Sequence, residues 1–219
     1  MTTAPAPAAA PTTAPPLLEP PLQRLVMAQL EELPEALTGQ TGPPRRVLVA
    51  AASKYEATAE IANAIAKVLT ERGFDAEAHE IDPSVQADGF DAFVIGSAVY
   101  SGHWLQPARW FVQSHAAVLS SHPVWLFSSG PVGDPPMPDE DPVDVTAIAE
   151  ATGAREHRVF AGRLEHSRLS IAEQALVVAL RAPEGDFRDW DAIRGWAGGI
   201  ADALAAPGPT TITGTISLD

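Results

Sequence analysis

Three short segments of this 219-residue chain have residue types and spacings that suit an anionic or planar ligand. The first, residues 53–58 (S-K-Y-E-A-T), leads directly into a predicted helix. Backbone N–H groups at a helix start attract anions, and hydroxyls and a lysine add donors, so this segment could hold a phosphate. The alternative is a structural helix start in which Ser53 and Glu56 form a capping box.

The other two segments combine small residues with aromatic or hydroxyl groups. Residues 96–104 (G-S-A-V-Y-S-G-H-W) allow close backbone approach, and Tyr100 and Trp104 offer flat surfaces on which a planar ligand could stack. The alternative for this segment is an ordinary strand–helix turn with its aromatic side chains packed inward. Residues 127–133 (F-S-S-G-P-V-G) place two hydroxyls and two glycines where a ligand could approach closely.

The sequence predicts neither a metal site nor a catalytic side chain. Cysteine is absent, which excludes disulfides, thiolate metal sites and cysteine nucleophiles. His103 has no second ligand at a metal-binding spacing. Five acids, Asp134, Asp139, Glu140, Asp141 and Asp144, lack the D-x-D-x-D-G order of a calcium loop, so we expect a solvated surface there. Beside a ligand site these acids would favour cationic partners and repel anionic ones.

The three segments follow predicted strands of one sheet. Apolar stretches at 47–52, 74–81, 90–96, 123–128 and 157–161 alternate with helical patterns, of which the later ones cover 105–119, 143–152, 171–181 and 189–204. This alternation predicts βαβ units and a parallel sheet covered on both faces. Ligands bind such sheets at the carboxyl ends of the strands, so we expect the three segments to meet there.

In combination, these segments resemble those of the flavodoxin-domain family, more closely its members of the quinone-dependent protoporphyrinogen IX dehydrogenase type. The similarity covers residues 45–204 and includes V-L-V-A-A-A-S-K-Y-E-A-T-A-E-I-A at 47–62 and V-F-A-G-R-L at 159–164. It implies an α/β, doubly wound, flavodoxin-like fold with a five-stranded parallel sheet in the order 2-1-3-4-5. It also implies a helical insertion before the last helix, and the residues before the similarity form an N-terminal extension.

The resemblance implies that FMN is bound, with its phosphate on the first segment and its isoalloxazine ring between the other two. The residues that it assigns to cofactor binding are Ser53, Lys54, Tyr55, Ala57, Thr58, Ser97, Ala98, Tyr100, Gly102, Trp104, Ser129, Gly130 and Gly133. The insertion would span 163–189, and its apolar helix (I-A-E-Q-A-L-V-V-A-L-R-A) is expected to pack on the sheet, with a docking surface as the alternative.

Glu56 departs from the family pattern, which generally has glycine at this position. A carboxylate about 6 Å from a dianionic phosphate would cost roughly 5 kcal/mol at an effective dielectric near 20. Glu56 could therefore abolish FMN binding, or occupy the anion site itself. If its side chain turns outward, the loss is small.

Two functional hypotheses follow. In the first, the chain is an FMN-binding redox protein, with a protoporphyrinogen- or quinone-type oxidoreductase as one form, and exchanges electrons with a small molecule or a protein. In the second, the fold has lost FMN because of Glu56 and acts as a binding, scaffold or cargo protein through its terminal extensions.

The composition divides the chain into four parts. Residues 1–21 form a disordered Ala/Pro/Thr head, 22–44 an amphipathic helix and linker, 45–206 the flavodoxin-like domain and 207–219 a flexible tail; the helix or the tail could bind a protein partner. The net charge of −14 argues against non-specific nucleic-acid binding. No apolar run is long enough to span a membrane and no signal peptide is recognisable, which predicts a cytoplasmic protein.

Overall fold

The computed structural model describes residues 45–206 except residue 131 and residues 134–140. The predictions for 1–44, for 207–219 and for three acids of the acidic segment lie outside these residues. A parallel sheet forms the centre of the described part, and the predicted fold class and strand order are confirmed. In the order in which they lie side by side, its strands are β2 (Asp75–Glu80), β1 (Arg46–Ala52), β3 (Ala92–Tyr100), β5 (Val124–Ser129) and β6 (Glu156–Phe160).

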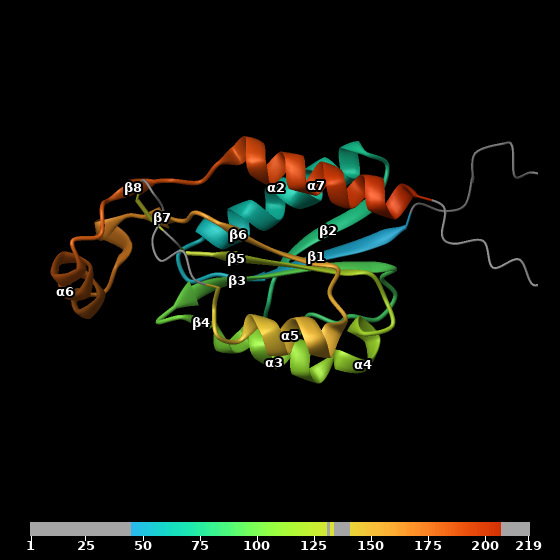
Figure 1. Cartoon of the computed structure of the whole chain (residues 1–219), viewed down its shortest axis with the longest axis horizontal. Helices are drawn as coiled ribbons and strands as arrows, with labels where there is room; N and C mark the ends of the chain where they lie inside the picture. The colour runs from blue at the N-terminus through green and yellow to red at the C-terminus, as the bar shows by residue number, and fades with distance from the viewer. Residues whose placement is uncertain (1–44, 131, 134–140, 207–219) are drawn as a thin grey trace, which may run out of the picture. The chain divides into compact units, whose positions relative to one another are not determined.

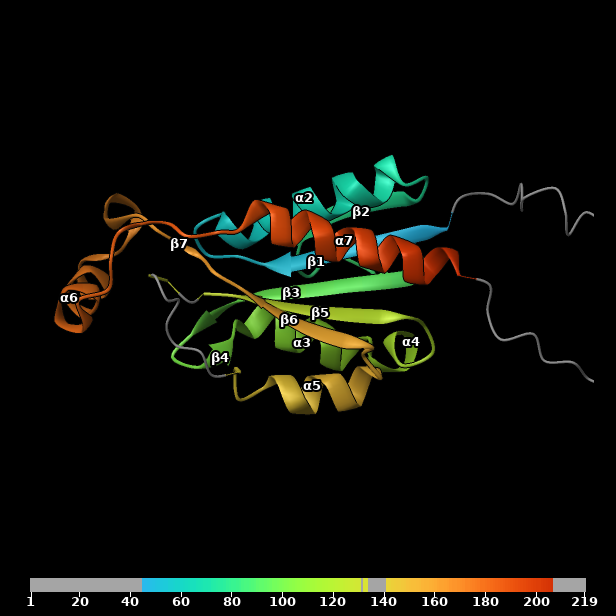
Figure 2. The ribbon, with the colours of Figure 1, turned by 45° about the horizontal axis from the view of Figure 1, so that its top comes forward.

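Helices cover both faces of this sheet, as Figures 1 and 2 show. One face carries α2 (Ala57–Glu71) and α7 (Trp190–Ala205), and the other carries α3 (Gln106–Ser114), α4 (Ala116–Leu119) and α5 (Val145–Thr152). The prediction of one continuous helix over 105–119 is wrong, because the backbone of His115 (φ −112°, ψ 14°) leaves the helical conformation between α3 and α4. Among the described residues, no helix is long and apolar enough to cross a membrane.

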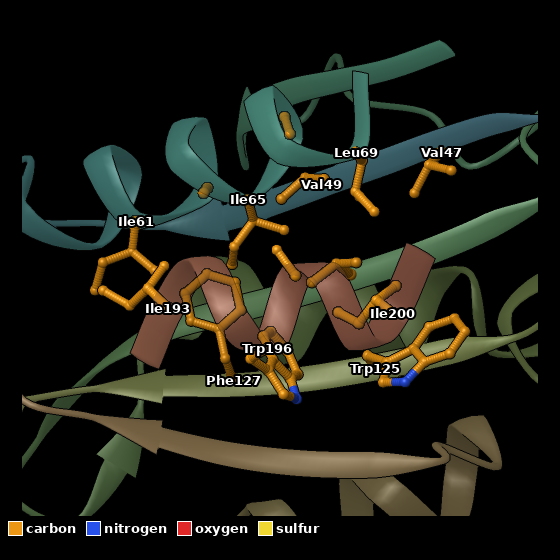
Figure 3. Packing of buried hydrophobic residues seen from close by; sticks show 14 of the residues in the cluster. Val47, Val49, Ile61, Ile65, Leu69, Trp125, Phe127, Ile193, Trp196 and Ile200 are labelled. Carbon is orange, nitrogen blue, oxygen red and sulfur yellow. The ribbon is translucent and has the colours of Figure 1, made fainter. Parts of the chain in front are cut away.

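The core between α2, α7 and the sheet follows the helical periodicity of the sequence. Ile61, Ile65 and Leu69 form one buried stripe of α2. They belong to the same buried cluster as Ile193 and Trp196 of α7 (Figure 3). Fully burying one such aliphatic side chain contributes about 1.5–3 kcal/mol, so this stripe fixes the start of α2 relative to the sheet.

The end of β3 forms a hairpin rather than the expected turn into a helix. Ser101 (φ 50°) and Gly102 (φ 77°) are the two loop residues, and the short strand β4 (His103–Trp104) pairs antiparallel with the last residues of β3. Positive φ at both central positions is the pattern of a type I′ turn, which matches the twist of paired strands.

The predicted insertion lies beyond the carboxyl ends of the strands (Figure 1). Its elements are β7 (Arg163–Leu164), the 3₁₀ turn η2 (His166–Arg168), α6 (Ile171–Leu180) and β8 (Gly185–Asp186). The prediction that α6 packs on the sheet is wrong: the β7–β8 ribbon carries it away, no residue of α6 is buried, and Ile171 is 87% and Leu180 69% exposed.

A buried arginine anchors the insertion to the domain. The side chain of Arg188 is 2% exposed and its guanidinium lies 2.7 Å from Glu60 Oε2 and 2.6 Å from Asp186 Oδ2. It also donates to the Ala57 carbonyl at the start of α2 (3.2 Å). A buried cation is tolerated only when it is paired and hydrogen-bonded, so these contacts tie β8 to the start of α2.

Candidate functional site

The segments after β1, β3 and β5 meet around a cavity of about 300 Å³ at the carboxyl edge of the sheet. This volume lies at the lower end of the range for small-molecule sites. Nine of the residues predicted from the sequence line it: Ser53, Lys54, Tyr55, Ala57, Thr58, Ala98, Tyr100, Ser129 and Gly130. The juxtaposition follows from the parallel sheet, because neighbouring parallel strands end at the same edge.

The structure places four predicted site residues outside the cavity lining: Ser97, Gly102, Trp104 and Gly133. Ser97 is buried, and its Oγ accepts a hydrogen bond from the Leu105 N–H (2.9 Å). Trp104 is 1% exposed within the core beneath α3, and its Nε1 donates to Ser128 Oγ (2.8 Å). The hairpin turns this indole inward, whereas Tyr100 remains at the cavity.

The start of α2 is built differently from the predicted capping box. Glu56 is the N-cap residue, in left-handed backbone (φ 66°, ψ −21°), and its side chain makes no capping hydrogen bond. The capping-box hypothesis for Ser53 and Glu56 is therefore wrong. The hydroxyl oxygen of Ser53 is buried and has no hydrogen-bond partner among the described residues. The N–H of Ala57 already donates to the Tyr55 carbonyl (2.8 Å), whereas those of Thr58 and Ala59 have no partner among the described residues. An unpaired buried hydroxyl beside such N–H groups is the environment that an oxyanion would complete.

The Glu56 carboxylate turns outward, away from the first N–H groups of α2. Its side chain is 70% exposed, and Oε2 accepts a hydrogen bond from Arg168 Nη1 (2.6 Å). This contact lowers the pKa of Glu56 and raises the pKa of Arg168. Arg168 belongs to the insertion, so the insertion supplies a cation that compensates the acid at the N-cap position of α2.

Lys54 is also paired with an acid of the insertion. Its Nζ lies 2.6 Å from Glu173 Oε1, and the Tyr55 hydroxyl donates to Glu173 Oε2 (2.5 Å). The hydrogen bond from Lys54 is the largest of the contacts that lower the pKa of Glu173 to about 2. Lys54 Nζ also lies 5.1 Å from the centre of the Tyr100 ring, within cation–π distance. Burial raises the pKa of Tyr100, which keeps this phenol neutral.

Sequence reasoning missed the contribution of the insertion to the cavity. The lining residues that it and the end of β6 supply are Gly162, Arg163, Leu164, Glu165, Arg168, Leu169, Glu173, Leu176, Val177, Leu180 and Ala182. The position of the insertion could have predicted this contribution, because it begins just after the carboxyl end of β6, and ligands bind at the carboxyl ends of strands in such sheets. The sheet segments supply most of the hydroxyls, while the insertion supplies most of the large aliphatic groups and two arginines.

A serine–histidine–aspartate array lies outside the cavity lining. Ser128 Oγ is 2.9 Å from His157 Nε2, and His157 Nδ1 is 3.5 Å from Asp141 Oδ1. Ser128 is fully buried and already accepts the indole N–H of Trp104, so this array is a structural network without a usable nucleophile. Among the described residues, no three His, Asp or Glu side chains converge as a metal site would need.

Comparisons with known proteins point to one family. The family model of the flavodoxin domain matches residues 48–191. A similar solved structure is a flavodoxin from the domain Archaea (14% identity, TM-score 0.53), with 74% of this chain and 99% of that chain covered. Another is the Streptococcus pneumoniae TIGR4 flavodoxin (19%, TM-score 0.50), with 73% and 97% covered.

A longer protein shows the same fold in part of its chain. Rubredoxin:oxygen oxidoreductase from the anaerobe Desulfovibrio gigas is 13% identical with a TM-score of 0.52, and the match covers 75% of this chain and 37% of that chain. No curated protein sequence matches this chain. At these identities the structural likeness establishes the fold alone.

Proposed function

Because this chain belongs to the flavodoxin-domain family, we propose that it is a redox protein that binds FMN in the cavity at the carboxyl edge of the sheet. The observation that carries this proposal is the buried hydroxyl of Ser53 at the start of α2, which has no partner among the described residues. A phosphate oxygen would accept hydrogen bonds from this hydroxyl and from the adjacent helical N–H groups. The residues present therefore fit a phosphate.

The lining residues suggest how the chain would hold the cofactor. The hydroxyls of Ser53 and Thr58 and the backbone N–H groups of Thr58 and Ala59 would bind the phosphate, and Lys54 would add charge. The ring would lie between the segment of Ala98 and Tyr100 and the segment of Ser129 and Gly130. When bound, FMN supplies the electron chemistry, so the side chains need to orient it and exclude water rather than act as acid or base.

Reconstitution with excess FMN followed by desalting tests this proposal directly. Retained flavin absorbance is the expected result, and its absence would contradict the proposal. Ser53→Ala should weaken FMN binding about tenfold, because a hydrogen bond to a charged group is lost. Ser120→Ala, in an exposed turn after α4, is the matched control and should bind FMN like the unchanged protein.

Two observations favour the second candidate, a flavodoxin fold that has lost FMN. Glu56 is the left-handed N-cap residue of α2, where the resemblance implies glycine, and Lys54 is already paired with Glu173. Such a protein would act as a scaffold or cargo protein through residues 22–44 or 207–219. A colourless protein after reconstitution, together with a protein partner that is lost on deleting either extension, would favour this candidate.

The aliphatic lining from the insertion favours a small apolar electron partner over a polar one. Leu169, Leu176, Val177 and Leu180 line the side of the cavity formed by the insertion. A quinone or a protoporphyrinogen has the apolar, planar character that such a surface accepts. Reduction of the FMN-loaded protein followed by mixing with a soluble quinone should give rapid reoxidation, whereas slow reoxidation would point to a protein partner.

A further inference from the structure

Glu173 makes the polar connection between α6 and the sheet part of the molecule. No residue of α6 is buried, yet the Glu173 side chain is only 19% exposed. It contacts Lys54 Nζ (2.6 Å), the Tyr55 hydroxyl (2.5 Å) and Ser170 Oγ (2.6 Å). Among the hydrogen bonds and ion pairs of the described residues, those of Glu173 with Lys54 and Tyr55 alone join α6 to residues outside the insertion.

One of these contacts uses a donor of the proposed phosphate site, Lys54, and the other uses its neighbour Tyr55, which also lines the cavity. Carboxylate and phosphate are both oxyanions and accept the same charge-assisted hydrogen bonds from ammonium and phenol groups. Glu173 Oε1 accepts a hydrogen bond from the Lys54 ammonium, and Oε2 accepts one from the Tyr55 hydroxyl. The Lys54 ammonium that Glu173 holds also lies against the Tyr100 ring, on the segment proposed to flank the cofactor ring.

We propose that Glu173 sets the affinity of this site by acting as an internal competitor, holding Lys54 and Tyr55 until the phosphate of the ligand displaces it. This inference rests on the proposed function, since FMN is the anion that would compete. Displacement of Glu173 also breaks the contacts between α6 and residues 53–58. Binding of the cofactor is thereby coupled to release of α6, which lines the cavity. Glu173 is thus an affinity-determining residue rather than a catalytic one.

A purely structural role for the Glu173 contacts predicts a result of opposite sign. If Glu173 kept its partners when ligand binds, it would hold the cavity wall in place, and neutralising it would loosen the wall and weaken binding. If it competes with phosphate, neutralising it strengthens binding. The direction of the change in FMN affinity therefore separates the two roles.

The deciding measurement is a fluorescence-quenching titration of FMN into the full-length protein and its variants. Glu173→Gln should bind FMN about tenfold more tightly, because a neutral amide holds Lys54 less strongly than a carboxylate does. Glu184→Gln removes the same charge from the same insertion but contacts only His166, so its affinity should stay within about twofold of the unchanged protein. Equal or weaker FMN binding by Glu173→Gln would overturn the inference.

A double-mutant cycle with Lys54→Met separates competition from general charge repulsion. The gain from Glu173→Gln should fall below about threefold in the Lys54→Met background if it acts through Lys54, and should persist in full if repulsion alone explains it. Persistence in full would overturn the inference.

Hydrogen exchange of the flavin-free protein gives a readout that needs no ligand. Amides of 171–180 should exchange faster in Glu173→Gln than in Glu184→Gln, with the sheet strands unchanged as a check on folding. Unchanged exchange in α6 would contradict its attachment through Glu173.

The two proposals fail in distinguishable ways. If the unchanged protein binds FMN and Glu173→Gln binds it no better, only the competition is overturned. If neither protein retains FMN, the proposed function fails and the competition fails with it. Binding by Glu173→Gln alone would support the competition and contradict the proposed function of the unchanged protein.

Discussion

Glu56, the N-cap residue of α2, has a left-handed backbone conformation. Its carboxylate points away from the anion site and pairs with Arg168. We therefore expect Glu56→Gly to change FMN affinity by less than about threefold, because an exposed and paired carboxylate is largely screened from the phosphate. Titration of FMN into both proteins checks this. An affinity gain of a hundredfold or more would mean that the carboxylate acts directly on the phosphate, as the distance estimate from the sequence alone implied.

Arg168 is the residue that makes Glu56 tolerable in this site. Arg168→Gln removes the cation and leaves the carboxylate uncompensated, so FMN affinity should fall by up to about tenfold. The Glu56→Gly background is the control: there Arg168→Gln should have a much smaller effect, because no acid remains to be compensated at position 56. An equal loss in both backgrounds would show instead that Arg168 binds the ligand itself.

The sequence predicted the part of the cavity that the sheet segments form, because residues at the ends of neighbouring parallel strands share one edge. It could not predict the orientation of Trp104, since a two-residue hairpin decides whether that indole faces the ligand or the core. Nor could it pair Glu173 with Lys54, which are 119 positions apart in the chain. The local sequence pattern contains no information about this contact, because α6 reaches Lys54 only through the three-dimensional course of the β7–β8 ribbon.

At the scale of elements, α7 contains two glycines that its packing does not require. Gly195 and Gly199 are exposed within the helix, and a Cβ at either position would meet no neighbouring atom within 4 Å. Gly195→Ala and Gly199→Ala should each raise the free energy of unfolding by roughly 0.5–1 kcal/mol, since alanine loses less backbone entropy in a helix. Urea denaturation measures the change.

Gly102 provides the opposite control for these helix substitutions. A Cβ there would also meet no atom within 4 Å, but the backbone has φ 77° in the β3–β4 hairpin. Gly102→Ala should therefore lower the free energy of unfolding by roughly 1 kcal/mol through backbone strain alone. If all three substitutions shifted stability in the same direction, backbone conformation would not be the cause.

Regular elements were predictable from the sequence because their apolar periodicity is strong. The buried stripe of α2 fits only a helix, and the continuous apolar runs of β1 and β5 fit strands buried on both faces. The position of α6 was not predictable, because an apolar helix normally packs on its own domain. Here the capping box of Ser170 and Glu173 stabilises α6 locally, and the β7–β8 ribbon holds it off the sheet.

At the scale of the whole molecule, one polar network joins three strands of the sheet. The Trp104 indole donates to Ser128, and Ser128 Oγ lies 2.9 Å from His157 Nε2, which links β4, β5 and β6. Ser128 can donate its hydroxyl proton only to a neutral imidazole, because both nitrogens of the charged ring are donors. Protonation of His157 would therefore leave the Ser128 proton without its acceptor inside the sheet.

Burial lowers the pKa of His157, more than nearby Asp141 raises it, and this makes the stability of the fold acid-sensitive. Because the unfolded histidine titrates near 6.5, the unfolded state binds more protons just below that pH, and the free energy of unfolding should fall as the pH drops below about 6.5. A single histidine sets a limit of about 1.4 kcal/mol per pH unit. The pKa values of Glu173 and Asp186 are lowered, so these acids stabilise the fold at neutral pH. Their contribution to the free energy of unfolding is lost only as the pH falls below about 4.5, which separates it from that of His157.

Urea denaturation at pH 7.5, 6.5 and 5.5 isolates the contribution of His157. His157→Gln can still hydrogen-bond Ser128 but cannot titrate, so its free energy of unfolding should change less over this range than that of the unchanged protein. His79→Gln leaves the Ser128–His157 hydrogen bond in place and is the matched control, so it should keep the pH dependence that His157 supplies. If His157→Gln lost stability in parallel with the unchanged protein, the acid sensitivity would arise elsewhere in the molecule.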